Sequence, residues 1–175
     1  MQVETCARPE DHLDEWLALY GQVCRRHRIT GIRAFSPESF RRQLRVPGLA
    51  MFRARHAGRT VAMHLWITQG EHAYGHLAGH DEAAYGLNAA YALYWHALQQ
   101  FRATGIARVD FGATTGDDAR ARDGLAFFKK GWATGTLIGY ICGRVLRADA
   151  YAALTAAMHP EPTDFFPAYR APVPV

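Results

Sequence analysis

The sequence predicts a mixed α/β domain, in which an antiparallel meander of strands leads into a parallel strand pair flanked by helices. Between residues 49 and 78, apolar-rich, partly alternating runs are separated by short turns, which is typical of strands. Over residues 89–101 the apolar residues recur three and four positions apart, which predicts a helix. A short apolar run over residues 107–112 follows this helix. A strand–helix–strand step of this kind places two strands in parallel, joined by a right-handed crossover.

Two helices precede the strands. Over residues 11–28 apolar residues recur at helical spacing, acidic residues cluster in the first turn, and arginines lie in the last turn. A second, short helix is expected to begin with Ser36 as its N-cap and Pro37 at the first helical position. Phe40 and Leu44 then give this short helix one apolar face.

The meander is expected to consist of three strands, Leu49–His56, Thr60–Thr68 and His72–Ala78. Short turns that contain Gly58 and Gly70 separate them. The three strands therefore form consecutive hairpins.

The long helix over residues 89–101 and the elements after it complete the predicted sheet. We interpret one stripe of the helix as core: Tyr91, Tyr94, Trp95 and Leu98. The run over residues 107–112 (ARVDFG) predicts a buried strand, and a polar loop follows at Thr114–Asp123. The loop leads into a short helix, Gly124–Trp132.

The C-terminal part is expected to contain a last strand, Thr136–Val145, and a last helix, Ala148–Met158. Five of the eight prolines lie in residues 160–175, which predicts an extended tail. The length of the chain fits one domain, so we predict a single domain over residues 1–159 followed by this tail.

The composition excludes several classes of protein. With 49% hydrophobic and 21% charged residues, the chain is globular rather than disordered. Three scattered cysteines are too few for a disulfide framework or a zinc site, and Cys24 and Cys142 are interpreted as small buried apolar residues. No apolar run reaches the ~18 residues of a membrane span, and no signal-peptide pattern follows Met1. These features indicate a cytoplasmic protein.

The charge is unevenly distributed along the chain. Residues 16–70 hold ten arginines against one acid, a local charge of +9, whereas the whole chain carries +4. Such a block favours a polyanion such as RNA or the phosphates of a nucleotide, although a solvated arginine-rich surface remains the alternative. Eighteen of the twenty cationic side chains are arginine, and the two lysines are neighbours, Lys129 and Lys130.

The order of elements resembles the GNAT acyltransferase fold, and two motifs in the second half narrow the resemblance. Val109–Gly112 (VDFG) is similar to a strand that ends in D-x-G. After the loop, GLAFFKKGW matches G-L-x-x-F-K-x-x-F/W at Gly124, Leu125, Phe128, Lys129 and Trp132. This combination resembles the Fem-type (FemAB-like) branch of the GNAT superfamily, which includes the aminoacyl-tRNA-dependent peptidyltransferases of cell-wall synthesis. The resemblance covers residues 13–146.

The resemblance implies an enzyme that transfers an acyl or aminoacyl group to the amine of a small molecule or a peptide. It implies no tightly bound cofactor, and a donor substrate that is either an aminoacyl-tRNA or an acyl-CoA. It also implies that Lys129 stabilises the transferred acyl group and that Phe128 shapes the acyl pocket. The chemistry agrees for Lys129, because a cation near the tetrahedral oxyanion of acyl transfer lowers the barrier.

Each of these candidate residues has a structural alternative. Lys129 could be a solvent-facing helical lysine, which is the expectation for Lys130, and Phe128 could be a core aromatic residue. Asp110 ends a strand, where it could orient a substrate amine or cap the following loop. Tyr140 could donate a proton or lie in the core.

One of four histidines could be a general base, because histidine titrates near neutrality, although each of them is more often structural. They are His64, His72, His76 and His80. On one strand the last three share a face, but consecutive members are ~13 Å apart, which is too far to bind one metal ion together. We therefore expect no metal site.

The junction before the long helix departs from the GNAT pattern. GNAT enzymes hold the pyrophosphate of CoA there on a glycine-rich loop, which implies Gly86, Leu87 and Asn88 as donor-binding residues. Here Asp81 and Glu82 precede them and would repel phosphate, so we expect weak binding of acetyl-CoA.

The length of the chain is a second departure. Fem-type ligases carry two GNAT halves, and this chain has room for one. Either a second copy or a partner GNAT half completes the site, or the chain acts alone on a smaller acceptor.

Two other functions stay open. One is a conventional acetyl-CoA-dependent N-acetyltransferase. The other is a catalytically silent GNAT-like module that binds RNA, including transfer RNA, or a protein partner through its basic half. A transferred product separates the enzymes from the silent module.

Overall fold

A computed structural model describes four stretches of the chain: residues 1–112, 124–140, 142–158 and 162–171. The loop expected at Thr114–Asp123 therefore lies outside the described residues. The chain divides into two compact units, Met1–Gly131 and Trp132–Val175, and each is described by itself.

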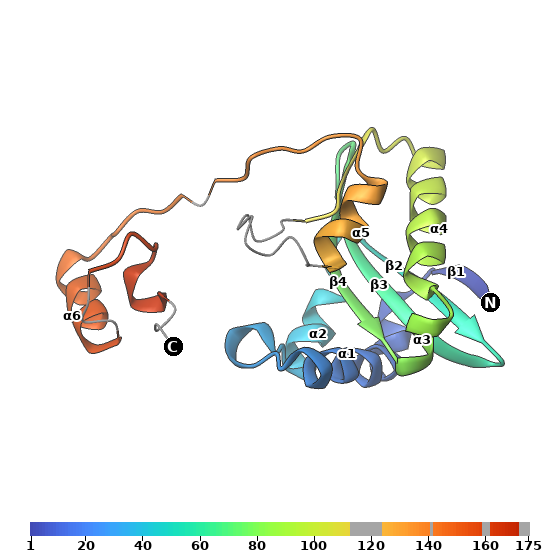
Figure 1. Ribbon diagram of the computed structural model, residues 1–175, viewed down its shortest axis with the longest axis horizontal. Coiled ribbons are helices and arrows are strands. Elements are labelled where there is room, and N and C mark those ends of the chain that lie inside the picture. Colours follow the sequence, from blue (N-terminus) through green and yellow to red (C-terminus); the bar gives the residue numbers. More distant parts are fainter. Residues whose placement is uncertain (113–123, 141, 159–161, 172–175) are drawn as a thin grey trace. The chain divides into compact units, whose positions relative to one another are not determined.

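The first unit is built on a five-stranded sheet with the order β1-β2-β3-β4-β5 (Figure 1). The strands are β1 (Gln2–Cys6), β2 (Leu49–His56), β3 (Arg59–Gln69), β4 (His72–His80) and β5 (Arg108–Asp110). Neighbouring strands are antiparallel, except that β4 and β5 are parallel. The predicted fold class, a meander followed by a parallel pair, is confirmed. Strand β1 was not predicted, because its five residues carry too little apolar alternation to stand out.

Helices α1 (Leu13–His27) and α2 (Pro37–Gln43) cover one face of the sheet. Helix α2 begins as predicted, because the hydroxyl oxygen of Ser36 accepts a hydrogen bond from the backbone N–H of Ser39 at 3.2 Å. The two helices and the sheet share one buried cluster, composed of Cys6, Trp16, Leu19, Tyr20, Phe40, Leu44, Met51, Met63 and Leu65.

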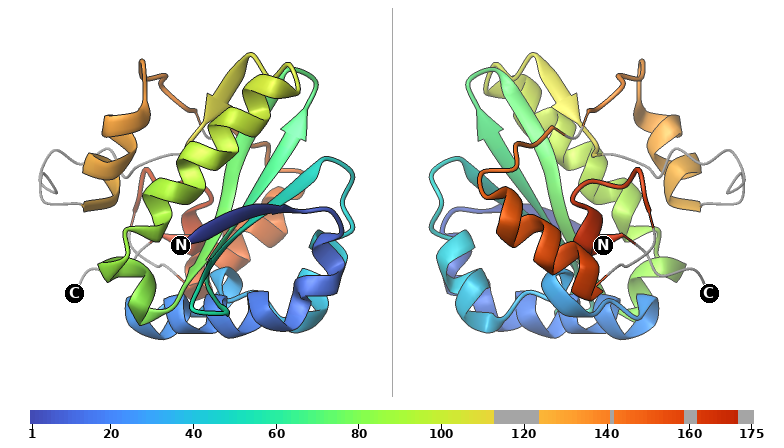
Figure 2. Two further views of the ribbon diagram at one scale, coloured as in Figure 1. Left: turned by 90° about the vertical axis from the view of Figure 1, so that its right-hand side faces the viewer. Right: turned by 90° about the vertical axis from the view of Figure 1, so that its left-hand side faces the viewer.

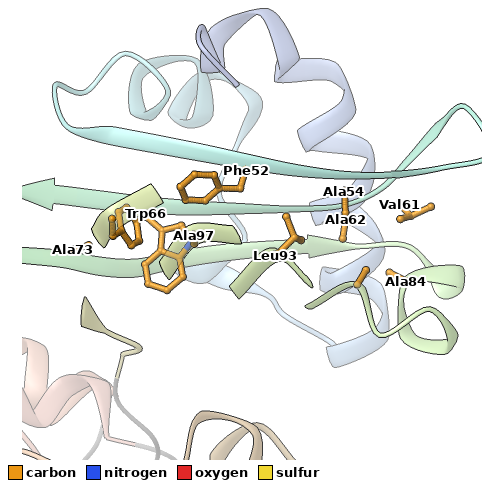
Figure 3. Close-up of a cluster of buried hydrophobic side chains, with 11 residues drawn as sticks. Phe52, Ala54, Val61, Ala62, Trp66, Ala73, Ala84, Leu93 and Ala97 are labelled. Carbon is orange, nitrogen blue, oxygen red and sulfur yellow. The ribbon is translucent and has the colours of Figure 1, made fainter. Parts of the chain in front are cut away.

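Helix α4 (Ala89–Ala103) lies across the other face of the sheet (Figure 2). Its buried residues are Ala89, Leu93, Ala97 and Phe101. Alanines meet the sheet because the strands already supply bulky rings there, among them Phe52 and Trp66 (Figure 3). The predicted core stripe is therefore wrong in part: Tyr91 and Trp95 are 49% and 60% exposed, on the flank of the helix.

A bulge interrupts the pairing of β3 with β4. Leu65 pairs with Leu77 but Trp66 pairs with Gly75, so His76 has no opposite residue on β3. The side chains before and after the bulge consequently change faces. The expectation that the three histidines of β4 share a face is wrong for this reason.

Strand β5 is shorter and less buried than predicted. It spans three residues, of which Arg108 and Asp110 are exposed and Val109 is half-buried. Only Val109 packs against the cluster under α4, because β5 has a described neighbour on one side alone. The strand therefore serves mainly to bring the following residues to the edge of β4.

The second unit contains α6 (Ala148–Met158), as predicted, whereas the described residues of Thr136–Val145 do not form the strand expected there. The described residues of that stretch have no regular structure, and Leu137 and Tyr140 are 88% and 81% exposed. Residues with high strand propensity form a strand only when a neighbouring strand accepts their hydrogen bonds. Tyr140 is therefore not a core residue.

Residues 162–171 pack on α6 rather than extending as a free tail. The ring of Tyr151 stacks on Phe166, and its hydroxyl oxygen accepts a hydrogen bond from the N–H of Ala168 at 2.8 Å. The domain boundaries, residues 1–159 and a tail over 160–175, stay a prediction. No helix in the described ranges is long and apolar enough to cross a membrane.

Candidate functional site

The site is built where β4 and β5 separate. Their pairing ends at Tyr74 and Asp110, and the chain continues from β5 into Phe111 and Gly112. A Cβ placed on Gly75 would lie 3.5 Å from the carbonyl oxygen of Asp110, so the two backbones remain close one residue after the pairing ends. This junction joins the edge of β4 to Phe111 and Gly112, which follow β5.

Lys129 reaches this junction from α5 (Gly124–Trp132), which begins and ends as predicted. Its ammonium nitrogen Nζ donates a hydrogen bond to the carbonyl oxygen of Gly112 at 3.1 Å. A Cβ on Gly112 would lie 3.4 Å from Nζ of Lys129 and 3.7 Å from the carbonyl oxygen of Gly75. Lys129 is half-buried, whereas Lys130 is exposed. The structure thus separates two adjacent lysines as expected, and places one beside the strand junction.

Aromatic rings pack around Phe128, the residue that precedes Lys129 in α5. Phe128 is half-buried and packs edge-to-face on Tyr91 and Tyr94 of α4, with ring centroids 4.8 and 4.9 Å apart. The ring of Tyr94 also stacks on Phe111, and burial raises the pKa of Tyr94 to about 12. Tyr94 therefore stays a neutral phenol at physiological pH. Phe128 is part of this aromatic wall, between the core and the surface.

Asp110 caps the turn that follows β5, which is the structural alternative to orienting a substrate amine. Its Oδ1 accepts a hydrogen bond from the N–H of Gly112 at 2.7 Å, which caps the turn after β5. Gly112 has a φ of 81°, a left-handed conformation that glycine adopts without strain. Asp110 and Lys129 thus hold opposite sides of the same glycine, one through its N–H and one through its carbonyl.

The residues implied for donor binding lie elsewhere, between two helices. Gly86 ends α3 (Glu82–Gly86), a short helix that was not predicted, and Leu87 and Asn88 link it to α4. Asn88 has a left-handed φ of 53° and makes no side-chain cap for α4. The structure therefore does not bring these three residues to Lys129 through any described contact.

Asp81 occupies the start of α3. The residue is buried, with 5% of its surface exposed. Its carboxylate accepts a hydrogen bond from the N–H of Ala84 at 2.9 Å and forms an ion pair with Arg59 at 3.0 Å. Glu82 pairs with Arg26 at 2.7 Å. A carboxylate therefore already fills the place where a helix N-terminus attracts an anion.

The four histidines have separate partners. Nε2 of His64 and Nε2 of His80 are 2.9 Å apart, and burial lowers the pKa of both rings, that of His80 to about 4. Nε2 of His76 is 2.8 Å from Oε1 of Gln43, on the opposite face of the sheet. Nδ1 of His72 is 3.3 Å from the hydroxyl oxygen of Tyr74. Across the described residues, no three His, Cys, Asp or Glu side chains are grouped to hold a metal ion.

A comparison with protein-family models matches residues 1–130 to the acetyltransferase (GNAT) domain family. The chain belongs to this family. It is accordingly an N-acyltransferase that transfers an acyl group to an amine, as the sequence predicted. A search of curated proteins gives no match.

Solved GNAT structures share the fold. An aminoglycoside acetyltransferase from an uncultured soil metagenomic sample, in complex with sisomicin, is 16% identical with a TM-score of 0.62 over 83% of this chain and 96% of its own. A ribosomal-protein-alanine N-acetyltransferase from Brucella melitensis biovar Abortus 2308 is 12% identical with a TM-score of 0.61 over 82% and 100%. At these identities the likeness shows the fold alone.

Because the chain has a GNAT fold, we asked whether the residues at the start of α3 fit the phosphates of CoA. A diphosphate would meet the carboxylates of Asp81 and Glu82 at that helix start, and the first of these already uses the N–H of Ala84. The residues present therefore do not offer the usual cradle for the CoA phosphates. Arginines 26 and 59 lie beside it, but each is paired with one of the two acids.

Sequence reasoning missed two residues of this GNAT site. Asp81 carries an N-cap signal that was interpreted only as a repulsive charge. Gln43 carries no signal, because its contact with His76 joins residues 33 positions apart.

Proposed function

We propose that this GNAT protein transfers an acyl or aminoacyl group to an amine at the junction of β4 and β5, with Lys129 stabilising the oxyanion. The observation that carries the proposal is the position of Nζ, 3.1 Å from the carbonyl oxygen of Gly112 at the point where the strands separate. An ammonium group fixed beside a strand edge stabilises negative charge that develops on an acyl oxygen there.

The aromatic rings around Phe128 favour an acyl group over a free ion as the ligand of this site. Phe128, which precedes Lys129 in the chain, forms edge-to-face contacts with Tyr91 and Tyr94 of α4. Apolar surroundings strengthen the interaction between the ammonium and a developing oxyanion, because they lower the local dielectric constant. Lys129 and Phe128 thus act together, and Asp110 holds the turn that positions them.

For the donor, we propose the Fem-type alternative, an aminoacyl-tRNA, over acetyl-CoA. The carboxylate of Asp81 at the start of α3 argues against strong binding of a CoA diphosphate. Gly86, Leu87 and Asn88 remain proposed contacts of the donor, because a Cβ on Gly86 would meet no atom within 4 Å, so that space is open.

A product assay tests this function. The protein is incubated with either acetyl-CoA or an aminoacyl-tRNA and with a panel of amines that includes sisomicin and a lysine-containing peptide, and products are measured by mass spectrometry. We expect an amide product with the aminoacyl donor and weak activity with acetyl-CoA. A product from acetyl-CoA at low-micromolar affinity would establish the conventional N-acetyltransferase instead. Binding of RNA without any product would establish the silent module.

The remaining assignments stay predictions. These are a cytoplasmic location, a small-molecule or peptide amine as acceptor, and a second copy or partner GNAT half that completes the site. Size-exclusion chromatography with light scattering measures the oligomeric state directly.

A further inference from the structure

His76 lies at the bulge of β4, one residue after Gly75. The carbonyl oxygen of Gly75 belongs to the same peptide unit as the N–H of His76, and it lies 3.7 Å from the position that a Cβ on Gly112 would take. The bulge therefore places the backbone of this histidine beside the strand junction, although the sequence did not distinguish it from three other histidines.

The contacts of His76 fix which ring nitrogen carries the proton. Nε2 of Gln43 donates a hydrogen bond to Oγ of Ser39 at 2.9 Å, so the amide oxygen Oε1 is the atom that faces His76. An amide oxygen only accepts hydrogen bonds, so Nε2 of a neutral His76 must donate. Nδ1 then keeps its lone pair and is free to accept a proton.

Accessibility and protonation state both suit a base. His76 is exposed, so a substrate can reach the ring. Partial burial lowers the pKa of the His76 ring below its ordinary value, so the ring is mainly neutral at pH 7. From α2, the neutral amide of Gln43 contacts the ring, and Ser39 holds that amide through a hydrogen bond. They also line a hollow of about 380 Å³ on that helix, with Ser36, Glu38, Arg42 and Val46.

His76 and Lys129 approach the junction from opposite faces of the sheet. Gln43 belongs to α2, which packs on the face with α1, whereas Phe128 beside Lys129 packs on α4. We propose that His76 is the general base that deprotonates the acceptor amine, and that Gln43, held by Ser39, is the residue that positions it. This inference rests on the acyl-transfer function proposed above.

The proposed step is balanced as follows. The amine nitrogen attacks the acyl carbon, and a C–N bond forms while the bond from the acyl carbon to the donor's leaving oxygen or sulfur breaks. Nδ1 of His76 takes the proton that the amine loses, and the leaving group accepts a proton when it departs. His76 thus returns to its neutral state when it passes that proton on to the leaving group or to water.

The tautomer is measured without any assay of activity. Long-range ¹H–¹⁵N NMR spectra of the full chain assign the two ring nitrogens of His76 between pH 5 and 8, with His76→Gln to identify the signals. We expect Nε2 to be protonated, Nδ1 to be unprotonated at pH 7, and a titration below the ordinary range. A proton on Nδ1, or a titration above pH 7, would overturn the assignment.

Kinetics test the role. With the donor–acceptor pair that the product assay identifies, His76→Gln should lower kcat by about 100-fold or more, the scale of general base catalysis, with little change in KM. Gln43→Ala should lower kcat less, and Gln43→Glu should restore it while moving the acid limb of the pH profile to higher pH, because a carboxylate raises the pKa of the ring. His56→Gln, at an exposed histidine at the end of β2, is the control and should leave kcat unchanged.

The outcomes separate the two proposals. Absence of turnover in the unmodified protein contradicts the transfer function, and with it the base. Turnover that His76→Gln leaves intact contradicts the base alone, because the transfer function then stands. An unchanged pH profile in Gln43→Glu contradicts the positioning role of Gln43.

Discussion

Two adjacent lysines on α5 differ in what surrounds them. Lys129 is half-buried and donates to the carbonyl oxygen of Gly112, whereas Lys130 is exposed. The composition pointed to this pair, because a chain that otherwise uses arginine keeps lysine only here. A guanidinium would place its charge over a plane rather than at one atom, so it does not replace an ammonium at the end of a hydrogen bond.

The first prediction follows from this difference. Lys129→Ala should lower turnover by roughly 10²–10³, the scale on which removal of one oxyanion donor acts, and kcat and kcat/KM should fall together. Lys129→Arg should retain little of the turnover that Lys129→Ala loses. Lys130→Ala is the matched control, with the same change one position along the helix. Equal and small effects at both lysines, measured in the product assay, would assign Lys129 to holding Gly112 only.

The buried pair His64 and His80 gives a second prediction, on stability. Burial lowers the pKa of both rings in the folded protein, that of His80 to about 4, whereas an unfolded chain binds a proton near pH 6.5. The unfolded state therefore gains protons first as the pH falls, and the free energy of unfolding decreases between about pH 6.5 and 4, by about 3 kcal/mol for a shift of this size. Above pH 7 the contribution is complete.

Urea unfolding at pH 7.5 and pH 5 measures this loss. The double variant His64→Phe with His80→Phe should flatten the pH dependence of the free energy of unfolding, because phenylalanine does not titrate. The neighbouring side chains there are aromatic rings, against which phenylalanine can pack. His56→Gln, at an exposed position at the end of β2, is the control and should leave the dependence unchanged. A steep loss that persists in the double variant would place its origin elsewhere.

At the scale of elements, the sequence predicted helices better than strands. Helices α4, α5 and α6 were found because periodicity and caps are local signals. The strand expected at Thr136–Val145 is absent from the described residues of that stretch, since a strand depends on a partner that local composition does not reveal. The bulge at His76 was equally hidden, because it exists only relative to the register of β3.

The short helix α3 carries the third prediction, on the donor. Asp81→Asn keeps an oxygen that can cap the N–H of Ala84, but removes the negative charge and releases Arg59 from its ion pair. Acetyl-CoA should therefore bind more tightly to this variant than to the unmodified protein, which we expect to bind it weakly. Isothermal titration calorimetry measures the affinity of acetyl-CoA for the variant and for the unmodified protein. Tight binding to the unmodified protein, or no gain in the variant, would contradict the role of Asp81.

At the scale of the whole molecule, ion pairs reduce the charge of the basic block. Arg26, Arg53 and Arg59 pair with acids outside residues 16–70, and Glu38 pairs with both Arg41 and Arg42. Four exposed arginines of the block form no ion pair within the described part of the chain: Arg25, Arg28, Arg33 and Arg45. Three of them, Arg25, Arg28 and Arg33, lie at the end of α1 and in the connection to α2.

The last prediction concerns this group of unpaired arginines. If they contact the phosphates of a transfer RNA, the logarithm of the association constant should fall linearly with the logarithm of salt concentration, with a slope no steeper than about −4 for four contacts. Fluorescence anisotropy between 50 and 200 mM salt measures the slope, and Arg28→Gln should reduce it by about 1. Arg26→Gln is the matched control, because that guanidinium is already paired with Glu82 and should contribute little. A slope near zero would instead make the block a solvated surface, and the aminoacyl donor would then lose its electrostatic support.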